Sequence, residues 1–220
     1  LDWGGKAFGE SEALLGAVLA SSPDLRDKMV LATKGSIIPG VPYIANAAYL
    51  NAACEASLTR LHSDHIDLYQ IHRPDMFTHP EETAAALDGL VEAGKISMVG
   101  VSNYTIPQVH ALRAYLKAPI VSLQKQYSLG DLDMLRDGSL DLCMETELTP
   151  LAWSPLGGGS LISGAGQRAD LMHAVDALAA RENVDGAAIV LAFILAHPSF
   201  FVPIIGSQSP DRLQAPIQPT

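Results

Sequence analysis

Short apolar runs alternate with longer amphipathic stretches along most of the chain. Helical spacing of apolar positions predicts helices at residues 9–20, 45–61, 81–93, 107–116, 139–147, 169–183 and 186–196, with another beginning at 210. The apolar runs between them predict six strands, at residues 29–34, 67–72, 96–103, 119–124, 148–154 and 201–207. Strands that alternate with helices indicate parallel pairing through right-handed crossovers.

Two folds fit this alternation, a doubly wound open sheet and a (β/α)8 barrel. A barrel brings all carboxyl strand ends to one mouth, whereas an open sheet spreads them along an edge. The early strand–helix turns also lack a G-x-G-x-x-G fingerprint. We therefore predict a single α/β domain over residues 1–220, a (β/α)8 TIM barrel with about two strands expected before Leu1. Polar residues end every predicted strand: Lys34, His72, Ser102-Asn103, Gln124, Trp153-Ser154 and Gly206-Ser207.

His72 is the first candidate for chemistry. It closes the apolar run 67–72, which Pro74 stops because proline cannot donate a ladder hydrogen bond. Functional sites of α/β folds lie at such strand ends. Taken alone, however, a single histidine is more often a strand cap, and Lys34 alone could equally face solvent.

Composition narrows the classes of function. The 220 residues carry Lys+Arg 14 against Asp+Glu 24, a net charge of −10, which argues against a nucleic-acid or anionic-membrane surface. No run of eighteen apolar residues predicts a membrane span. Cys54 and Cys143 lie in helical stretches and are interpreted as buried free thiols of a reducing, cytoplasmic compartment. No metal site is expected.

Four motifs, in order and correctly spaced, resemble the aldo-keto reductases. They cover essentially the whole chain, and the variant at residues 71–75 is similar to the bacterial oxidoreductase branch. Any one of them would be a weak signal, but four in sequence are a strong one. The motifs are Val30-Leu31-Ala32-Thr33-Lys34, Asp67-Leu68-Tyr69-Gln70-Ile71-His72, Val99-Gly100-Val101-Ser102-Asn103, and residues 150–159 from Pro150 to Gly159.

The resemblance implies a barrel that binds a nicotinamide cofactor, usually NADPH, without a Rossmann domain. Hydride passes to a carbonyl carbon while a tyrosine hydroxyl protonates the oxygen. Lys34 and His72 match two members of the family's Asp, Tyr, Lys and His tetrad. None of the chain's tyrosines precedes the helix that opens at residues 9–12, so the tyrosine and aspartate are expected before Leu1.

This chemistry explains the residue types that the resemblance assigns. A tyrosine with an ordinary pKa near 10 is a poor acid at neutral pH. An adjacent ammonium, here that of Lys34, stabilises the phenolate and lowers that pKa. His72, in its neutral form, would donate a hydrogen bond to the carbonyl oxygen and orient the substrate.

Cofactor contacts carry over by position, and each has a plainer explanation. Strand-end capping, a core tryptophan or a capped turn would account for these residue types without the motifs around them. The nicotinamide carboxamide would be bound by residues matching Ser102, Asn103 and Gln124, and the ring stacked on the nicotinamide would be Trp153. The pyrophosphate would lie along Ser154, Pro155, Leu156 and Gly158. The adenosine 2′-phosphate site is matched by Gly206, Ser207, Gln208, Ser209 and Arg212.

Two departures from the family pattern affect the cofactor. Gly206 stands where many members have lysine, so NADH remains an alternative to NADPH. Ala215 and Pro216 stand where the family has adenine-binding Glu-Asn, and the chain after Leu213 resembles a truncated tail.

Two other classes of function stay open. Lys34 could form a Schiff base in an aldolase, with residues 206–207 binding a substrate phosphate. The chain could also be a nucleotide-binding regulatory subunit of the potassium-channel β-subunit kind, although that branch typically has asparagine at the position of His72. For the leading interpretation we expect a small-molecule carbonyl substrate and a monomer, because no heptad seam is visible.

Overall fold

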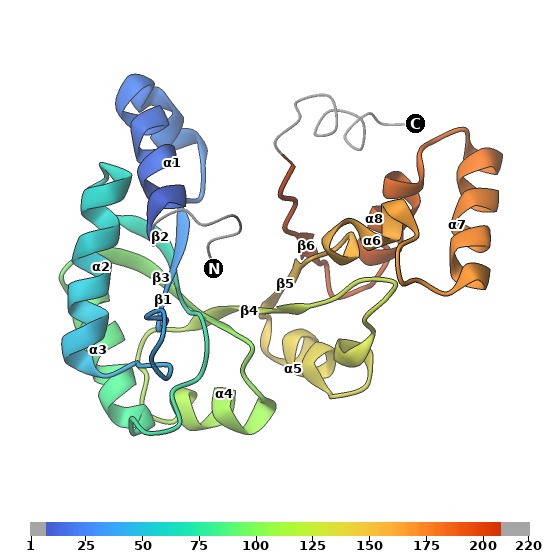
Figure 1. Cartoon of the computed structure of the whole chain (residues 1–220). Coiled ribbons are helices and arrows are strands. Elements are labelled where there is room, and N and C mark those ends of the chain that lie inside the picture. The colour runs from blue at the N-terminus through green and yellow to red at the C-terminus, as the bar shows by residue number, and fades with distance from the viewer. Residues whose placement is uncertain (1–7, 208–220) are drawn as a thin grey trace. The chain divides into compact units, whose positions relative to one another are not determined.

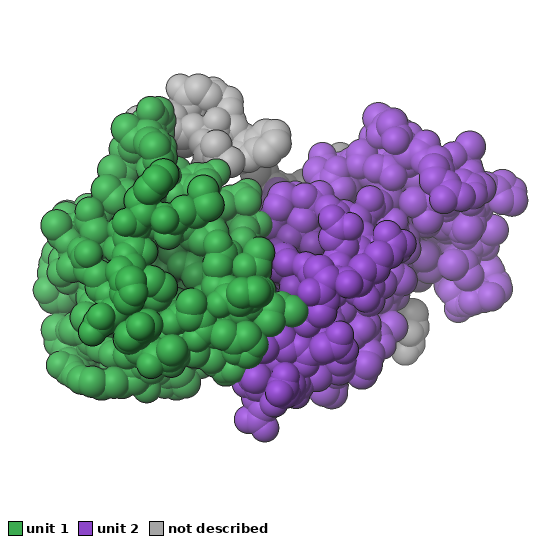
Figure 2. Space-filling view, turned by 90° about the horizontal axis from the view of Figure 1, so that it is seen from below, with its two compact units in different colours: residues 1–121 green, residues 122–220 purple. Residues whose placement is uncertain are grey.

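The computed structural model describes residues 8–207, which fall into two compact units. Unit 1 comprises residues up to Val121 and unit 2 begins at Ser122 (Figure 2). Strand β4 (Ile120–Gln126) contains the boundary. The prediction of a single domain stays a prediction.

Unit 1 alternates helices and parallel strands as the hydrophobic pattern predicts. Strands β1, β2 and β3 lie side by side in this order, with Lys34 of β1 opposite Gln70 of β2, and Gln70 opposite Gly100 of β3. Helices α1, α2 and α3 follow one another along one side of these strands (Figure 1). The elements are α1 (Glu10–Ser21), the 3-10 helix η1 (Pro23–Lys28), β1 (Ala32–Gly35), α2 (Ala47–Leu61), β2 (Ile66–Ile71), α3 (Pro80–Glu92), β3 (Ile96–Ser102) and α4 (Ile106–Arg113).

Unit 2 continues the parallel pairing. Ser122 of β4 lies opposite Thr149 of β5, and Leu151 of β5 lies opposite Val202 of β6. The elements that follow β4 are the 3-10 helix η2 (Asp133–Leu135), α5 (Ser139–Thr146), β5 (Thr149–Trp153), the 3-10 helix η3 (Gly157–Gly159), α6 (Ser160–Ser163), α7 (Ala169–Glu182), α8 (Gly186–Leu195) and β6 (Val202–Pro203).

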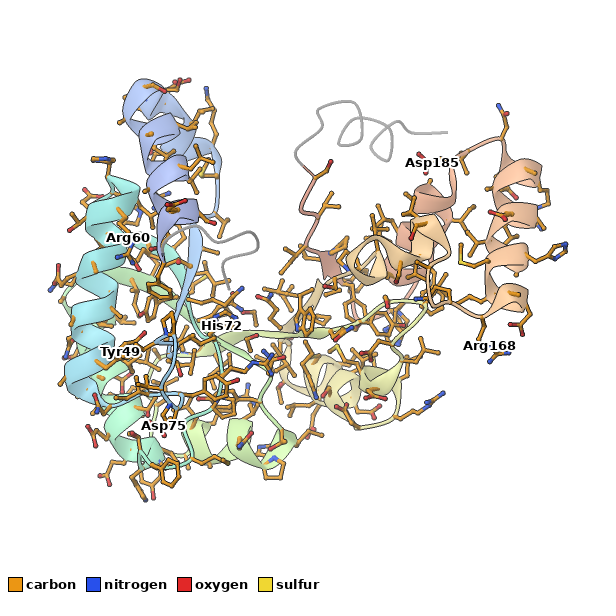
Figure 3. The ribbon with its side chains drawn as sticks, viewed as in Figure 1. Tyr49, Arg60, His72, Asp75, Arg168 and Asp185 are labelled. Atoms are coloured by element: carbon orange, nitrogen blue, oxygen red, sulfur yellow. The ribbon has the colours of Figure 1, made fainter. Side chains whose placement is uncertain are left out.

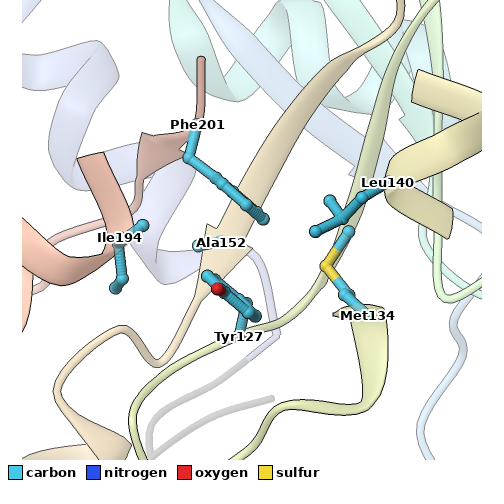
Figure 4. Close-up of a cluster of buried hydrophobic side chains, with 6 residues drawn as sticks. All are labelled: Tyr127, Met134, Leu140, Ala152, Ile194 and Phe201. Atoms are coloured by element: carbon cyan, nitrogen blue, oxygen red, sulfur yellow. The ribbon is translucent and has the colours of Figure 1, made fainter. Parts of the chain in front are cut away.

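The core of unit 2 includes a cluster around stacked aromatic rings (Figure 4). The rings of Tyr127 and Phe201 have centroids 4.4 Å apart and are inclined by only 3°. Tyr127 is 1% exposed, so this contact lies fully inside. The cluster consists of Tyr127, Met134, Leu140, Ala152, Ile194 and Phe201.

Each unit contains one cysteine, and both are buried free thiols, as predicted. Cys54 lies on α2 and Cys143 on α5. Burial raises the pKa of Cys54 to about 11 and that of Cys143 to about 12. At neutral pH both thiols are therefore protonated and unreactive.

The predicted elements within residues 8–207 are all present, with corrections at their ends. Strand β1 begins at Ala32 rather than Met29, because the Leu31 amide donates to the Asp67 carboxylate at 2.7 Å instead of joining the ladder. Strand β6 has two residues, although residues 201–207 were predicted. The three 3-10 helices and α6 were not predicted, and the helix expected from residue 210 lies outside the described residues.

Within residues 8–207, no helix combines the length and the apolar character needed to cross a membrane.

Candidate functional site

Lys34 and His72 lie at the carboxyl ends of two neighbouring strands of unit 1. The His72 amide donates to the Gly35 carbonyl at 2.9 Å, so His72 is fixed beside the residue that follows Lys34. From the other side, Asn103 Nδ2 donates to the His72 carbonyl at 3.1 Å. The same Asn103 nitrogen donates to Ser102 Oγ at 2.8 Å. Four predicted site residues of unit 1 thus lie at the ends of β1, β2 and β3, namely Lys34, His72, Ser102 and Asn103. Figure 3 labels His72.

The electrostatics of this group favour a neutral imidazole. Burial, together with a smaller contribution from the nearby Lys34 charge, lowers the pKa of His72 to about 4. Burial also lowers the pKa of Lys34 below its usual value. At pH 7 His72 therefore carries one ring N–H that can donate a hydrogen bond, which is the form that polarisation of a carbonyl oxygen requires.

The loops that follow β1 and β2 are tied to each other by polar side chains. Ser36 Oγ donates to the Arg73 carbonyl at 2.7 Å. Asp75 accepts from the Ala45 amide at 2.9 Å and from Thr78 Oγ1 at 2.6 Å. Burial alone would raise the pKa of Asp75, but hydrogen bonds from Thr78 and from backbone amides outweigh it and lower that pKa. This bonding fixes the loops after β1 and β2, which form the rim next to His72.

The rim also exposes apolar side chains. Val41 is 51% exposed in the loop after β1, while Met76 and Phe77 are 81% and 86% exposed in the loop after β2. These two loops therefore present apolar surface beside His72, and surface loops of this kind often carry function.

The predicted cofactor residues of unit 2 also follow strand ends. Gln124 lies on β4 and is 4% exposed, and Trp153 is the last residue of β5. Trp153 is half-buried rather than buried, which favours a ring that faces a site over a core tryptophan. Gly206 and Ser207 follow β6.

A turn of three glycines follows β5. The Gly157 amide donates to the Ser154 carbonyl at 2.8 Å, and Ser154 itself has a φ of 50°. Gly157, Gly158 and Gly159 all have positive φ, a conformation that side chains oppose. Among the described residues, nothing lies within 4 Å of a Cβ built on Gly158 or Gly159. This open backbone fits the close approach of a pyrophosphate, so the residues present suit a dinucleotide.

Three predicted cofactor residues fall outside the described part of the chain. They are Gln208, Ser209 and Arg212, which belong to the expected 2′-phosphate site. Residues 8–207 contain no group of side chains that could hold a metal ion.

A parallel α/β architecture with polar residues at its strand ends is typical of barrel-type enzymes. The chain belongs to the aldo/keto reductase family, whose sequence model matches residues 4–219. It is therefore an NAD(P)H-dependent oxidoreductase of small-molecule carbonyl compounds, as predicted.

Similar proteins support this assignment. The chain is 46% identical over 211 residues to a 6-dehydroglucose reductase of Novosphingobium aromaticivorans, covering 96% of this chain and 69% of the relative. It is 38% identical to a 6-dehydroglucose reductase of Agrobacterium fabrum, covering 93% and 71%. It is also 33% identical to the oxidoreductase YdhF of Escherichia coli, covering 95% and 72%. These oxidoreductase names favour the reductase over the aldolase and the non-catalytic subunit.

A solved structure supports the predicted fold class. The thermostable aldo-keto reductase Tm1743, crystallised with the inhibitor epalrestat, superposes with a TM-score of 0.84 at 27% identity and covers 95% of this chain and 71% of that one. The predicted α/β fold of the (β/α)8 class is thereby confirmed, although the six strands within residues 8–207 do not close an eight-stranded barrel.

Sequence reasoning missed the side chains that support the site. Ser36 and Asp75 tie the rim loops, and Glu12 bonds Thr33 next to Lys34. Asp75 was inside a recognised motif, so its position was visible although its bonding was not.

Proposed function

We propose that the protein reduces an aldehyde or ketone to an alcohol with NADPH, using Lys34 and His72 as catalytic residues. One observation carries the proposal: Lys34 and a His72 held neutral by burial lie at adjacent strand ends, and His72 is bonded to the Gly35 carbonyl at 2.9 Å. A histidine protonated at pH 7 would compete with the tyrosine as the proton donor, whereas a neutral one gives the carbonyl oxygen a hydrogen bond without transferring the proton.

The two residues have separate tasks in this proposal. The neutral His72 donates its N–H to the substrate's carbonyl oxygen and fixes the substrate's orientation. Lys34 places an ammonium beside the tyrosine expected before Leu1 and lowers that tyrosine's pKa. The tyrosine then gives its proton to the carbonyl oxygen. When bound, the reduced nicotinamide supplies the hydride.

The cofactor residues are proposed from their positions at the strand ends. Ser102 and Gln124 are almost fully buried, so their polar atoms are well suited to a fixed carboxamide partner. The proposed set is Ser102, Asn103 and Gln124 for the carboxamide, Trp153 for the ring face, Ser154, Pro155, Leu156 and Gly158 for the pyrophosphate, and Gly206, Ser207, Gln208, Ser209 and Arg212 for the adenosine phosphate.

A sugar aldehyde is the substrate that we propose to test first. Two relatives, 46% and 38% identical, are named 6-dehydroglucose reductases. Their shared name points to a polyhydroxy compound with an aldehyde at the terminal carbon.

The test combines cofactor titration with kinetics on the natural, full-length protein. Fluorescence titration should show tighter binding of NADPH than of NADH, and Arg212→Ala should remove most of that preference. Lys34→Met should lower kcat about 10²–10⁴-fold, the range of general acid–base assistance. Lys117→Met is the control, since the Lys117 side chain is 80% exposed and its ammonium lies 3.5 Å from the Glu92 carboxylate at the surface.

Two outcomes would overturn the proposal. One is full reductase activity in Lys34→Met. The other is borohydride trapping of a carbonyl substrate on Lys34 in a protein that does not turn over either nucleotide, which would establish the aldolase instead.

A further inference from the structure

We propose that Glu12 is a positioning residue for Lys34, acting through the hydroxyl of Thr33. The inference rests on the proposed function, because it takes Lys34 as catalytic. Glu12 does not touch the reacting atoms; it fixes the strand that carries the Lys34 ammonium.

The contacts join three elements of unit 1 around one carboxylate. Thr33 Oγ1 on β1 donates a short hydrogen bond to Glu12 Oε1 on α1. Arg60 on α2 donates from Nε to Glu12 Oε2 at 2.6 Å, and its Nη2 lies 2.6 Å from the same oxygen. The Glu12 side chain is 16% exposed and the Arg60 side chain 29% exposed, so water competes little for these bonds (Figure 3 labels Arg60).

Helix α1 is shaped to bring Glu12 to this place. Gly9, Glu12 and Gly16 are spaced at i, i+3 and i+7, which puts them on one face of the helix. A Cβ on Gly9 would lie 2.7 Å from Arg60 Nε, and a Cβ on Gly16 would lie 2.0 Å from the Arg60 carbonyl oxygen. Gly16 is therefore required for α1 to approach the α2 backbone at Arg60, whereas Gly9 faces the flexible Arg60 side chain and is favoured by its own φ of 88°.

The pleat of the strand transmits this contact to Lys34. Successive side chains of a strand point to opposite faces, so Thr33 and Lys34 face away from each other. Because β1 has only four residues, a bond to Thr33 constrains its rotation about its own axis. Rotation of the strand would move the Lys34 side chain by the same angle on the opposite face. The Glu12–Thr33 bond thus sets where the ammonium points.

The experiment removes the bond from either end in the natural, full-length protein. Thr33→Val deletes the hydroxyl with almost no change of shape, and Glu12→Gln removes the charge. Thr33→Ser keeps the hydroxyl and removes only the methyl group. We expect Thr33→Val and Glu12→Gln each to lower kcat about tenfold, the effect of one lost charged hydrogen bond. Thr33→Ser should return kcat to within about threefold of the natural value, and KM for NADPH should change by less than about twofold.

A pH profile separates positioning from general support. With the Lys34 ammonium displaced, the acidic tyrosine keeps a higher pKa, so the alkaline fall in kcat should move to higher pH in Thr33→Val. The double variant Glu12→Gln with Thr33→Val should be no slower than Glu12→Gln alone, because the Thr33 bond is common to both changes while the Arg60 pair is lost only with Glu12. Thr59→Val is the matched control: the Thr59 hydroxyl donates to the Glu55 carbonyl on the exposed side of α2, and its loss should change none of these values.

Clear outcomes would refute the role of Glu12. An unchanged kcat and pH profile in a folded Thr33→Val would do so, as would a Thr33→Ser variant no faster than Thr33→Val. Additive losses in the double variant would show independent, merely structural effects. Lys34→Met distinguishes the two proposals: if it is fully active, the proposed function fails, whereas if it is inactive and Thr33→Val is normal, only this inference fails.

Discussion

The two units hold their strand ends by different means. In unit 1, side chains bond to loops: Asn103 holds the His72 carbonyl, Ser36 holds the Arg73 carbonyl and Asp75 holds the Ala45 amide. In unit 2, a stacked Tyr127–Phe201 pair packs beside β5, and the strand leads into a turn of positive-φ glycines. The difference fits the proposed function, in which unit 1 supplies the catalytic side chains and the glycine turn of unit 2 supplies backbone for the cofactor's pyrophosphate.

The largest effect on stability is expected in the aromatic cluster of unit 2. Tyr127→Ala should lower the free energy of unfolding by about 3–5 kcal/mol, since it removes a fully buried ring and leaves a cavity. Tyr115→Ala is the control, because Tyr115 is 47% exposed. Denaturant unfolding followed by circular dichroism measures both. Equal losses for the two variants would contradict the assignment of the cluster as core.

A smaller loss of stability is expected when the hydrogen bonds of Asp75, in the loop beside His72, are removed. Asp75→Asn keeps the shape but removes the charge that three donors share, and should cost about 2–3 kcal/mol, as for hydrogen bonds to a charged group. It should also raise KM for the carbonyl substrate, since the loop beside His72 loosens. Asp24→Asn, which breaks only an exposed pair with Lys28, should cost less than about 0.5 kcal/mol. A rim variant as stable as this control would show that the bonds are not needed.

The smallest expected effect on the free energy of unfolding is its dependence on pH. The folded pKa of His72 is about 4, below the ordinary 6.5, so between these values the unfolded chain binds a proton that the folded chain does not. Stability should therefore fall as the pH decreases from about 6.5 to about 4, by about 1–2 kcal/mol after allowance for partial access of water. His72→Gln should lack this component. Unfolding midpoints measured across that range would contradict the neutral histidine if the two proteins gave parallel curves.

Hydrophobic periodicity was sufficient to place Lys34, His72, Ser102 and Asn103 at strand ends, because apolar runs that stop abruptly mark those ends. It could not show that the Asp67 carboxylate accepts a hydrogen bond from the Leu31 amide and shortens β1, since a side-chain bond across 36 residues leaves no periodic pattern in the sequence. The Glu12–Arg60 pair, 48 residues apart, was invisible for the same reason.

Helix α6 was missed for a different reason. No helix was expected between residues 154 and 169, yet the three positive-φ glycines lead directly into α6 at Ser160. The low helix propensity of the glycines hid this start, which a hydrogen bond from the Ser160 hydroxyl to the Gly157 carbonyl at 2.7 Å supports. The site itself could be predicted only through the family motifs, because no single strand-end residue specifies its role.

The placement of the cysteines gives each unit its own kinetic reporter. Cys54 is 0% exposed in unit 1 and Cys143 is 2% exposed in unit 2. A thiol reagent can reach either sulfur only when the helix around it opens, so the rate of modification follows that opening. Mass spectrometry of the two peptides after timed alkylation would give separate opening rates for the two halves, without any introduced label. The natural sequence thus allows the local dynamics of unit 1 and unit 2 to be compared in one sample.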